Sequence, residues 1–169
     1  ELVIENAGLV EIWNALLAAG AEFGVLPCGL GARDTLRTEM GYVLHGQDIS
    51  PEISPVQART GWAVGWNKES FAGKAALTAE KAAGAKRVAW GLLATGRGIP
   101  RSHMQVKTAS GEVVGETTSG TFSPTLQKGI ALALLSPEVS LGETLTIDVR
   151  GRDLEVVVTK PPFVDSTTK

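Results

Sequence analysis

The sequence contains little cysteine, little histidine and little excess charge. Cys28 is the single cysteine among 169 residues, so neither an internal disulfide nor a cysteine-based zinc site can form. The two histidines, His45 and His103, are far apart in the sequence and form no metal-ligand pair, so we expect ordinary surface or hydrogen-bonded histidines and no metal site. With a net charge of −2, the chain lacks the basic footprint of a protein that binds DNA or RNA.

Long apolar runs are also missing. No stretch approaches the roughly 20 residues that a membrane-spanning helix needs, and no segment has the pattern of a signal peptide. The low cysteine content favours a reducing compartment, and we expect a cytoplasmic protein without membrane association. The chain opens on Glu-Leu-Val-Ile instead of methionine, which leads to the hypothesis that Glu1 is a boundary inside a larger protein.

The residues that are present indicate a globular protein with two different halves. Hydrophobic residues make up 43% and charged residues 20%, as in ordinary folded domains. Residues 1–85 carry 6 basic and 10 acidic side chains, a net of −4, whereas residues 86–169 carry 10 basic and 8 acidic ones, a net of +2. We therefore predict two domains, 1–85 and 86–169.

The first half has the spacing of helices. Apolar residues recur at helical intervals from position 9 and predict a helix that Asn6 caps and Gly20 ends in the left-handed conformation. The apolar face of that helix needs sheet partners, and the single short strand expected at residues 1–4 does not supply them. The further elements expected are a helix at 30–40, an irregular connection at 41–61, a strand at 62–66 and a helix from Ser70 to Gly84.

The second half has the spacing of short strands. Turn residues such as Ser110-Gly111 and Arg150-Gly151 separate them, and Pro161-Pro162 ends the last one. Six strands at this spacing favour a small barrel or a sandwich. The strands are expected at residues 87–95, 104–108, 112–118, 129–135, 144–149 and 154–159.

Residues 27–37 carry the one pattern with possible binding chemistry. Arg33 and Arg37 are four positions apart and share a helix face, where two guanidinium groups could bind carboxylates, although a solvated charged face has the same spacing. The glycines at 29 and 31 could expose N–H groups to an anion, but a tight turn is the default reading. Cys28 is expected to be a buried structural cysteine and not a nucleophile.

The same stretch, Gly-Leu-Gly-Ala-Arg-Asp-Thr-Leu-Arg at 29–37, closely resembles the helix motif of the glycine cleavage T-protein family. Phe-Ala-Gly-Lys-Ala-Ala-Leu at 71–77 resembles a second motif of this family. Further stretches match in the same order, and the set covers nearly the whole chain. They are residues 1–4, 40–49, 54–62, 97–101, 115–124 and 160–164.

The resemblance implies an α+β protein, in which a truncated α/β folate-binding portion precedes a small antiparallel β-barrel. It also implies a site for tetrahydrofolate. Glu1 matches a glutamate that binds the pterin ring, and Arg33 matches an arginine of the folate site. Trp62 matches an aromatic residue that lines the pocket, although a tryptophan on an alternating strand is also a typical core residue. Arg101 matches an arginine that the barrel contributes.

By the same resemblance, the parent enzyme is an aminomethyltransferase. It takes the aminomethyl group from the lipoylated H-protein, releases ammonia and forms 5,10-methylenetetrahydrofolate. The catalytic aspartate of the family lies upstream of Glu1, so we expect this chain to hold no catalytic residue and to be inactive without the missing N-terminal half. The tail at 165–169 also lacks a tyrosine found in related enzymes.

Two alternatives stay open at the level of the sequence. The chain could be a T-protein-like module of a related demethylase, dehydrogenase or iron–sulfur assembly factor. It could also be a non-catalytic interaction module whose barrel, with its net positive charge, docks a protein or an acidic ligand.

Overall fold

A computed structural model describes residues 2–165 of the chain. The chain divides into two compact units, Glu1–Arg33 and Asp34–Lys169. The boundary that composition predicts near residue 85 lies inside the second unit, and the division into domains 1–85 and 86–169 stays a prediction. Within residues 2–165, no helix is long and apolar enough to cross a membrane.

The first unit is built around helix α1, Leu9–Gly20, with a 3₁₀ turn at each end. The helix is confirmed, but residues 2–4 form no strand and the Asn6 side chain forms no cap. Gly20 has a right-handed φ of −85°, and the chain turns left-handed later, at Gly24 with φ 69°. A side chain at position 20 would collide with Val25, since a Cβ atom there would lie 2.6 Å from it. Gly20 therefore serves close packing and not the left-handed turn.

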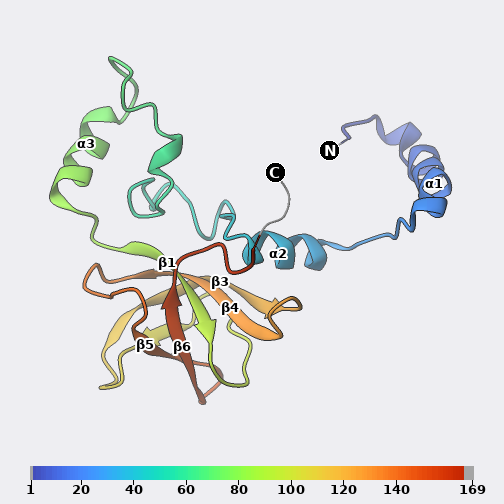
Figure 1. Ribbon diagram of the computed structural model, residues 1–169. Helices are drawn as coiled ribbons and strands as arrows, with labels where there is room; N and C mark the ends of the chain where they lie inside the picture. Colours follow the sequence, from blue (N-terminus) through green and yellow to red (C-terminus); the bar gives the residue numbers. More distant parts are fainter. Residues whose placement is uncertain (1, 166–169) are drawn as a thin grey trace. The chain divides into compact units, whose positions relative to one another are not determined.

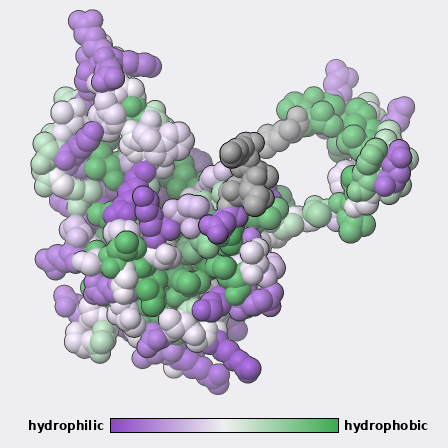
Figure 2. Space-filling model, viewed as in Figure 1, coloured by the Kyte–Doolittle hydropathy of each residue, from purple (hydrophilic) through white to green (hydrophobic). Residues whose placement is uncertain are grey.

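Helix α1 leaves apolar side chains exposed, which Figure 2 shows as hydrophobic surface along it. In a globular protein, the apolar face of a helix normally packs against a core. The large exposed ones are Leu9, Val10, Trp13 and Leu16.

In the next part of the chain, helices α2, Leu30–Glu39, and α3, Lys74–Ala83, flank an irregular stretch. The strand predicted at 62–66 is wrong. The chain forms a 3₁₀ turn there, Gly61–Ala63, and the Trp66 indole N–H donates to the Gly61 carbonyl at 2.7 Å, which closes the segment on itself. Helix α3 begins at Lys74 and not at Ser70, because Gly73 directly before it has a left-handed φ of 86°.

The remaining chain forms a closed antiparallel barrel with the strand order β1-β4-β3-β2-β5-β6 (Figure 1). Both the α+β class and the barrel are confirmed, and each of the six predicted strands is present. Their bounds are β1 Val88–Ala94, β2 Gln105–Lys107, β3 Val113–Ser123, β4 Lys128–Leu135, β5 Thr144–Asp148 and β6 Asp153–Thr159.

The core fills the inside of this barrel, and strand β4 shows how it is organised. β4 is buried along nearly its whole length because both of its faces are covered. Ala131, Ala133 and Leu135 point into the core, as alternation along a strand requires. The alternate residues, Leu132 and Leu134, are buried on the outer face instead, where they contribute to a pocket.

Candidate functional site

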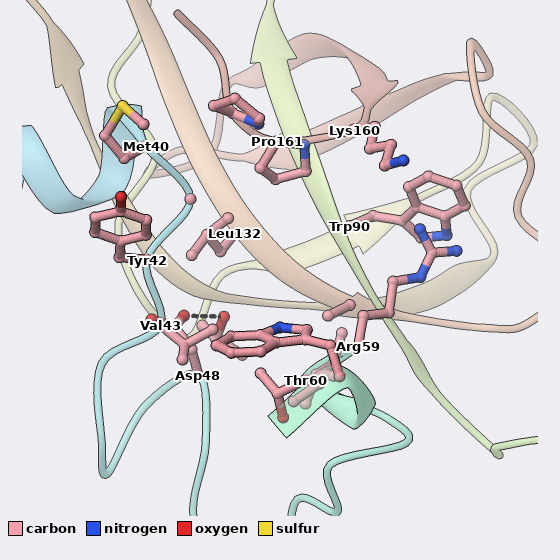
Figure 3. A pocket seen from close by; sticks show the side chains of 17 residues that line it. Met40, Tyr42, Val43, Asp48, Arg59, Thr60, Trp90, Leu132, Lys160 and Pro161 are labelled. Atoms are coloured by element: carbon pink, nitrogen blue, oxygen red, sulfur yellow. Dashed lines mark hydrogen bonds between the residues drawn. The ribbon is translucent and has the colours of Figure 1, made fainter. Parts of the chain in front are cut away.

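A pocket of about 450 Å³ lies on the outer wall of the barrel, within the second unit. Its volume falls in the range of small-molecule sites, and its lining is mainly apolar and aromatic. Figure 3 shows Met40 and Tyr42 on one side of it, with Trp90, Arg59 and Lys160 on the other. Segments far apart in the sequence line it: residues 40–43 and 48, 58–60 and 62, 89–90, 118, 132, 134 and 160–162.

The end of α2 supplies one wall of the pocket. Gly41 has φ 68°, its N–H donates to the Thr38 carbonyl at 2.9 Å, and the N–H of Tyr42 donates to the Arg37 carbonyl at 2.7 Å. This is the pairing of a left-handed glycine cap, which ends a helix and redirects the chain. The cap brings Gly41 against Pro161 of the segment after β6, so that the two form a continuous wall.

Trp62 also lines the pocket and is 86% exposed. The 3₁₀ turn holds its backbone, because the N–H groups of Ala63 and Val64 donate to Thr60 and Gly61. Trp62 is therefore not a core residue, which excludes that alternative. An indole presented in this way offers a flat apolar surface to a ligand.

Asp48 lies at the base of the pocket and is 4% exposed, but its carboxylate is fully engaged. It accepts from Arg37 Nη1 at 2.7 Å, from the Leu44 N–H at 2.8 Å and from Ser119 Oγ at 2.9 Å. Thr118 Oγ1 donates to its second oxygen. This carboxylate therefore fixes the loop after α2 to strand β3 and is not free to act on a ligand.

Arg37 is the centre of the same network. The spacing of residues 33 and 37 left two readings open, a pair of guanidinium groups that bind carboxylates and a solvated charged face, and for Arg37 the solvated face is wrong. Arg37 is 8% exposed, and its guanidinium binds Asp34 at 2.8 Å, Asp48, and Ser119 Oγ at 3.0 Å. Its donors are used inside the protein, because a buried guanidinium must be paired.

A second buried carboxylate ties the end of α2 to the barrel. Glu39, 5% exposed, accepts from the hydroxyl of Ser123 and from both the N–H and the hydroxyl of Thr125, the last two at 3.2 and 3.1 Å. The Glu39 carbonyl accepts from the Phe163 N–H at 2.8 Å. Together with Asp48, this contact holds the pocket walls in a fixed geometry.

Arg59 adds a cation to the lining. Its guanidinium lies 3.5 Å from the centroid of the Trp90 ring, in the geometry of a cation–π pair. Partial burial lowers the pKa of Arg59 from its ordinary value. An arginine stays charged at neutral pH, so the pocket keeps a positive charge at this point.

The structure brings Trp62 to the pocket but leaves two predicted site residues elsewhere. Arg101 is exposed outside the lining, and its guanidinium donates to the Gly120 carbonyl at 3.4 Å. Arg33 is exposed on the first turns of α2 and belongs to the first unit. Glu1 lies outside the described residues.

The remaining candidates of the sequence have no part in a site. Cys28 is exposed, so its prediction as a buried residue is wrong; it lies in an irregular segment before α2. His45 and His103 are exposed. In the part of the chain that the structure describes, no cluster of metal-ligating side chains occurs.

Arg59, Trp90 and Asp48 are pocket residues that the sequence did not single out. Trp90 alternates with Ala89 and Gly91 along β1, a pattern that separates two faces of a strand without showing what covers them. Asp48 follows Gly46 in a turn, where an aspartate is ordinary. Nothing in the sequence distinguishes Arg59 from other surface arginines.

The barrel and the pocket on its wall define a class: an antiparallel barrel domain joined to a helical segment, with a pocket between the loop after α2 and the strands. Family models then place the chain. The GCVT N-terminal domain matches residues 1–68, and the glycine cleavage T-protein C-terminal barrel domain matches residues 87–165. The chain belongs to the glycine cleavage T-protein family.

The chain is also similar in sequence to proteins named aminomethyltransferase. The chain is 63% identical over 158 residues to an aminomethyltransferase of Frankia alni, covering 94% of this chain and 43% of that protein. It is 56% identical over 167 residues to an aminomethyltransferase of Mycobacterium tuberculosis, covering 98% of this chain and 45% of that protein. The chain thus spans less than half the length of these relatives.

A solved structure supports the fold. The glycine cleavage system aminomethyltransferase T from Bartonella henselae superposes with a TM-score of 0.75 at 32% identity. The match covers 80% of this chain and 39% of that one.

Proposed function

We propose that this chain acts as the C-terminal part of an aminomethyltransferase of the glycine cleavage system. The complete enzyme transfers the aminomethyl carbon from the lipoylated H-protein to tetrahydrofolate and releases ammonia. The names of the relatives support the transferase activity, and the name of the Bartonella protein supports the glycine cleavage context. Tetrahydrofolate, the H-protein and a cytoplasmic location follow from the resemblance in the sequence and belong to the proposal.

The observation that carries the proposal is the pocket with Trp62 in its lining. The resemblance expects an aromatic residue at this position to pack against folate, and the indole is exposed and held by a closed turn. A flat apolar wall and a volume of about 450 Å³ fit a planar bicyclic ring and its aromatic extension. Glu1, Arg33 and Arg101 are proposed as further folate contacts in the complete enzyme.

In this function the chain positions the ligand. Asp48, which is the one lining carboxylate among residues 2–165, is held by Arg37 and by hydroxyl and N–H donors, so it is not available to exchange a proton with a ligand. Tetrahydrofolate supplies the nitrogen atoms that accept the one-carbon unit. The chain contributes orientation, which raises the rate by holding reactants together.

The exposed apolar face of α1 also supports a role as one part of a larger protein. Trp13 and Leu16 are about half exposed, although burying such side chains would stabilise a fold by about 1.5–3 kcal/mol each. A further part of the same enzyme is the proposed partner of this face.

The proposal predicts a specific defect for Trp62→Ala in the full-length enzyme that contains this chain. Loss of the aromatic wall should raise the KM for tetrahydrofolate about 10-fold, because stacking and apolar burial together contribute one to a few kcal/mol. Since Trp62 is exposed, the free energy of unfolding should change little. The measurement is the rate of methylenetetrahydrofolate formation at varied tetrahydrofolate.

Phe122→Ala is the matched control, because Phe122 is a partly exposed aromatic residue of β3 outside the pocket lining. It should leave the KM unchanged. Equal KM values for the Trp62 variant and the wild type would show that this pocket does not bind folate.

A further inference from the structure

Arg59 has a backbone conformation that a side chain disfavours. Its φ is 56°, in the left-handed region where glycine is preferred and other residues are uncommon. The turn itself closes through backbone groups, since the Arg59 N–H donates to the Val56 carbonyl at 3.3 Å and the Thr60 N–H to the Pro55 carbonyl at 2.9 Å. Glycine would adopt this φ with less backbone strain. We therefore attribute the arginine at this position to a function of its side chain.

That side chain is placed against Trp90 with its donors free. The Ala89 N–H donates to the Gln57 carbonyl at 2.8 Å, which joins the segment before Arg59 to strand β1 next to Trp90. The guanidinium then stacks on the indole at 3.5 Å. Among residues 2–165, no hydrogen bond or ion pair engages the guanidinium nitrogens of Arg59, whereas those of Arg37 bind Asp34, Asp48 and Ser119.

Stacking uses the face of a guanidinium and leaves its edge, which carries the N–H donors, available in the plane. That edge matches a carboxylate, which accepts two parallel N–H bonds. Arg59 is exposed at the pocket, so its N–H donors are accessible to a ligand, and partial burial lowers its pKa from the ordinary value.

Lys160 adds a second cation on the same side of the pocket (Figure 3). In the part of the chain that the structure describes, Lys160 has no ion pair or side-chain hydrogen bond. Asp48, a carboxylate of the lining, is neutralised by Arg37. This side of the pocket is therefore positive, while the rest of the lining is apolar.

We propose that Arg59, stacked on Trp90 and assisted by Lys160, is a carboxylate-binding subsite of this pocket. It selects ligands in which a planar apolar body carries a carboxylate at one end. The inference rests on the proposed function, and for tetrahydrofolate the group bound is a carboxylate of its glutamate end. The planar ring then extends from Arg59 along the apolar lining.

The test is calorimetric titration of the full-length enzyme with tetrahydrofolate and with its diamide, in which amides replace both glutamate carboxylates. Arg59→Gly removes the guanidinium and places glycine at a φ that suits it, so the variant should fold at least as well as the wild type. Arg150→Gly is the matched control, because Arg150 has the same kind of backbone, φ 57°, and lies outside the pocket.

Arg59→Gly should weaken tetrahydrofolate binding about 10- to 100-fold, the usual effect of losing charge-assisted hydrogen bonds, and Lys160→Gln should weaken it less. The diamide should bind the wild type and Arg59→Gly equally. Arg150→Gly should match the wild type with both ligands.

Unchanged tetrahydrofolate binding by Arg59→Gly would overturn the subsite and leave the folate function standing. An equal loss for tetrahydrofolate and the diamide would also overturn it, because Arg59 would then act through the shape of the pocket. A wild-type enzyme that binds no tetrahydrofolate would overturn the proposed function together with this inference.

Discussion

At the scale of residues, Arg33 and Arg37 share a helix and differ in their surroundings. Arg33 is exposed, whereas Arg37 is buried among two carboxylates and a serine hydroxyl. The four-residue spacing correctly places both on a helix, but spacing alone does not show which of the two a barrel strand 82 positions later will cover. The tertiary fold brings Ser119 to Arg37.

The Arg37–Asp48 pair should be important for stability. Arg37→Met leaves two carboxylates without their cation, one of them buried, and should lower the free energy of unfolding by about 3–5 kcal/mol. The double variant Arg37→Met with Asp48→Asn should lose less than the sum of the two single losses, because it removes charge on both sides. Urea unfolding followed by tryptophan fluorescence measures both.

Arg33→Met is the control on the same helix and should change the free energy of unfolding by less than about 0.5 kcal/mol, as for other exposed positions. A loss below about 1 kcal/mol for Arg37→Met would contradict the buried network.

Trp62 and Cys28 show where sequence patterns mislead for single residues. The alternation of Trp62, Val64 and Trp66 predicted a half-buried strand, yet the hydrogen bond from Trp66 to Gly61 closes a turn and exposes Trp62. Cysteine is commonly buried, but Cys28 lies exposed in an irregular segment before α2. The place of Trp62 in the pocket lining agrees with the resemblance and did not follow from its local pattern, while its contact with folate stays a prediction.

At the scale of elements, the barrel was the more predictable part. β5 and β6 alternate between buried and more exposed residues, glycine-containing turns separate most of the strands, and each strand pairs with neighbours in one closed sheet. The stretch between α2 and α3 has no periodicity, and long-range contacts such as Asp48 with Thr118 fix it instead. Such contacts join residues that no local pattern connects.

The cap at the end of α2 gives a test at this scale. A Cβ atom at Gly41 would lie 2.3 Å from Pro161 Cβ, whereas at Gly46, also left-handed with φ 86°, it would meet nothing within 4 Å. Both Gly41→Ala and Gly46→Ala carry the cost of a left-handed alanine. Gly41→Ala should cost about 1–3 kcal/mol more, the usual effect of overpacking.

Thermal unfolding of the two variants side by side measures this difference. Equal destabilisation would mean that the segment around Pro161 does not pack on the helix cap. This result would contradict a pocket wall formed by Gly41 and Pro161.

At the scale of the whole molecule, the pocket gathers segments from residue 40 to residue 162. Sequence analysis predicted most of the elements that carry these segments, but not that barrel closure would bring β4, β1 and the chain after β6 against the loop following α2. A closed sheet places its first and last strands side by side, as β1 and β6 are here. This is why Trp90 and Lys160 meet at one site and why the sequence did not show it.

The central claim is that the chain forms one wall of a folate site whose other parts lie in the rest of the enzyme. The most direct measurement is calorimetric titration with tetrahydrofolate of the 169-residue chain alone and of the chain mixed with the separately produced N-terminal half of the enzyme. We expect binding in the mixture and none by the chain alone. A well-folded mixed complex that binds no tetrahydrofolate would contradict it.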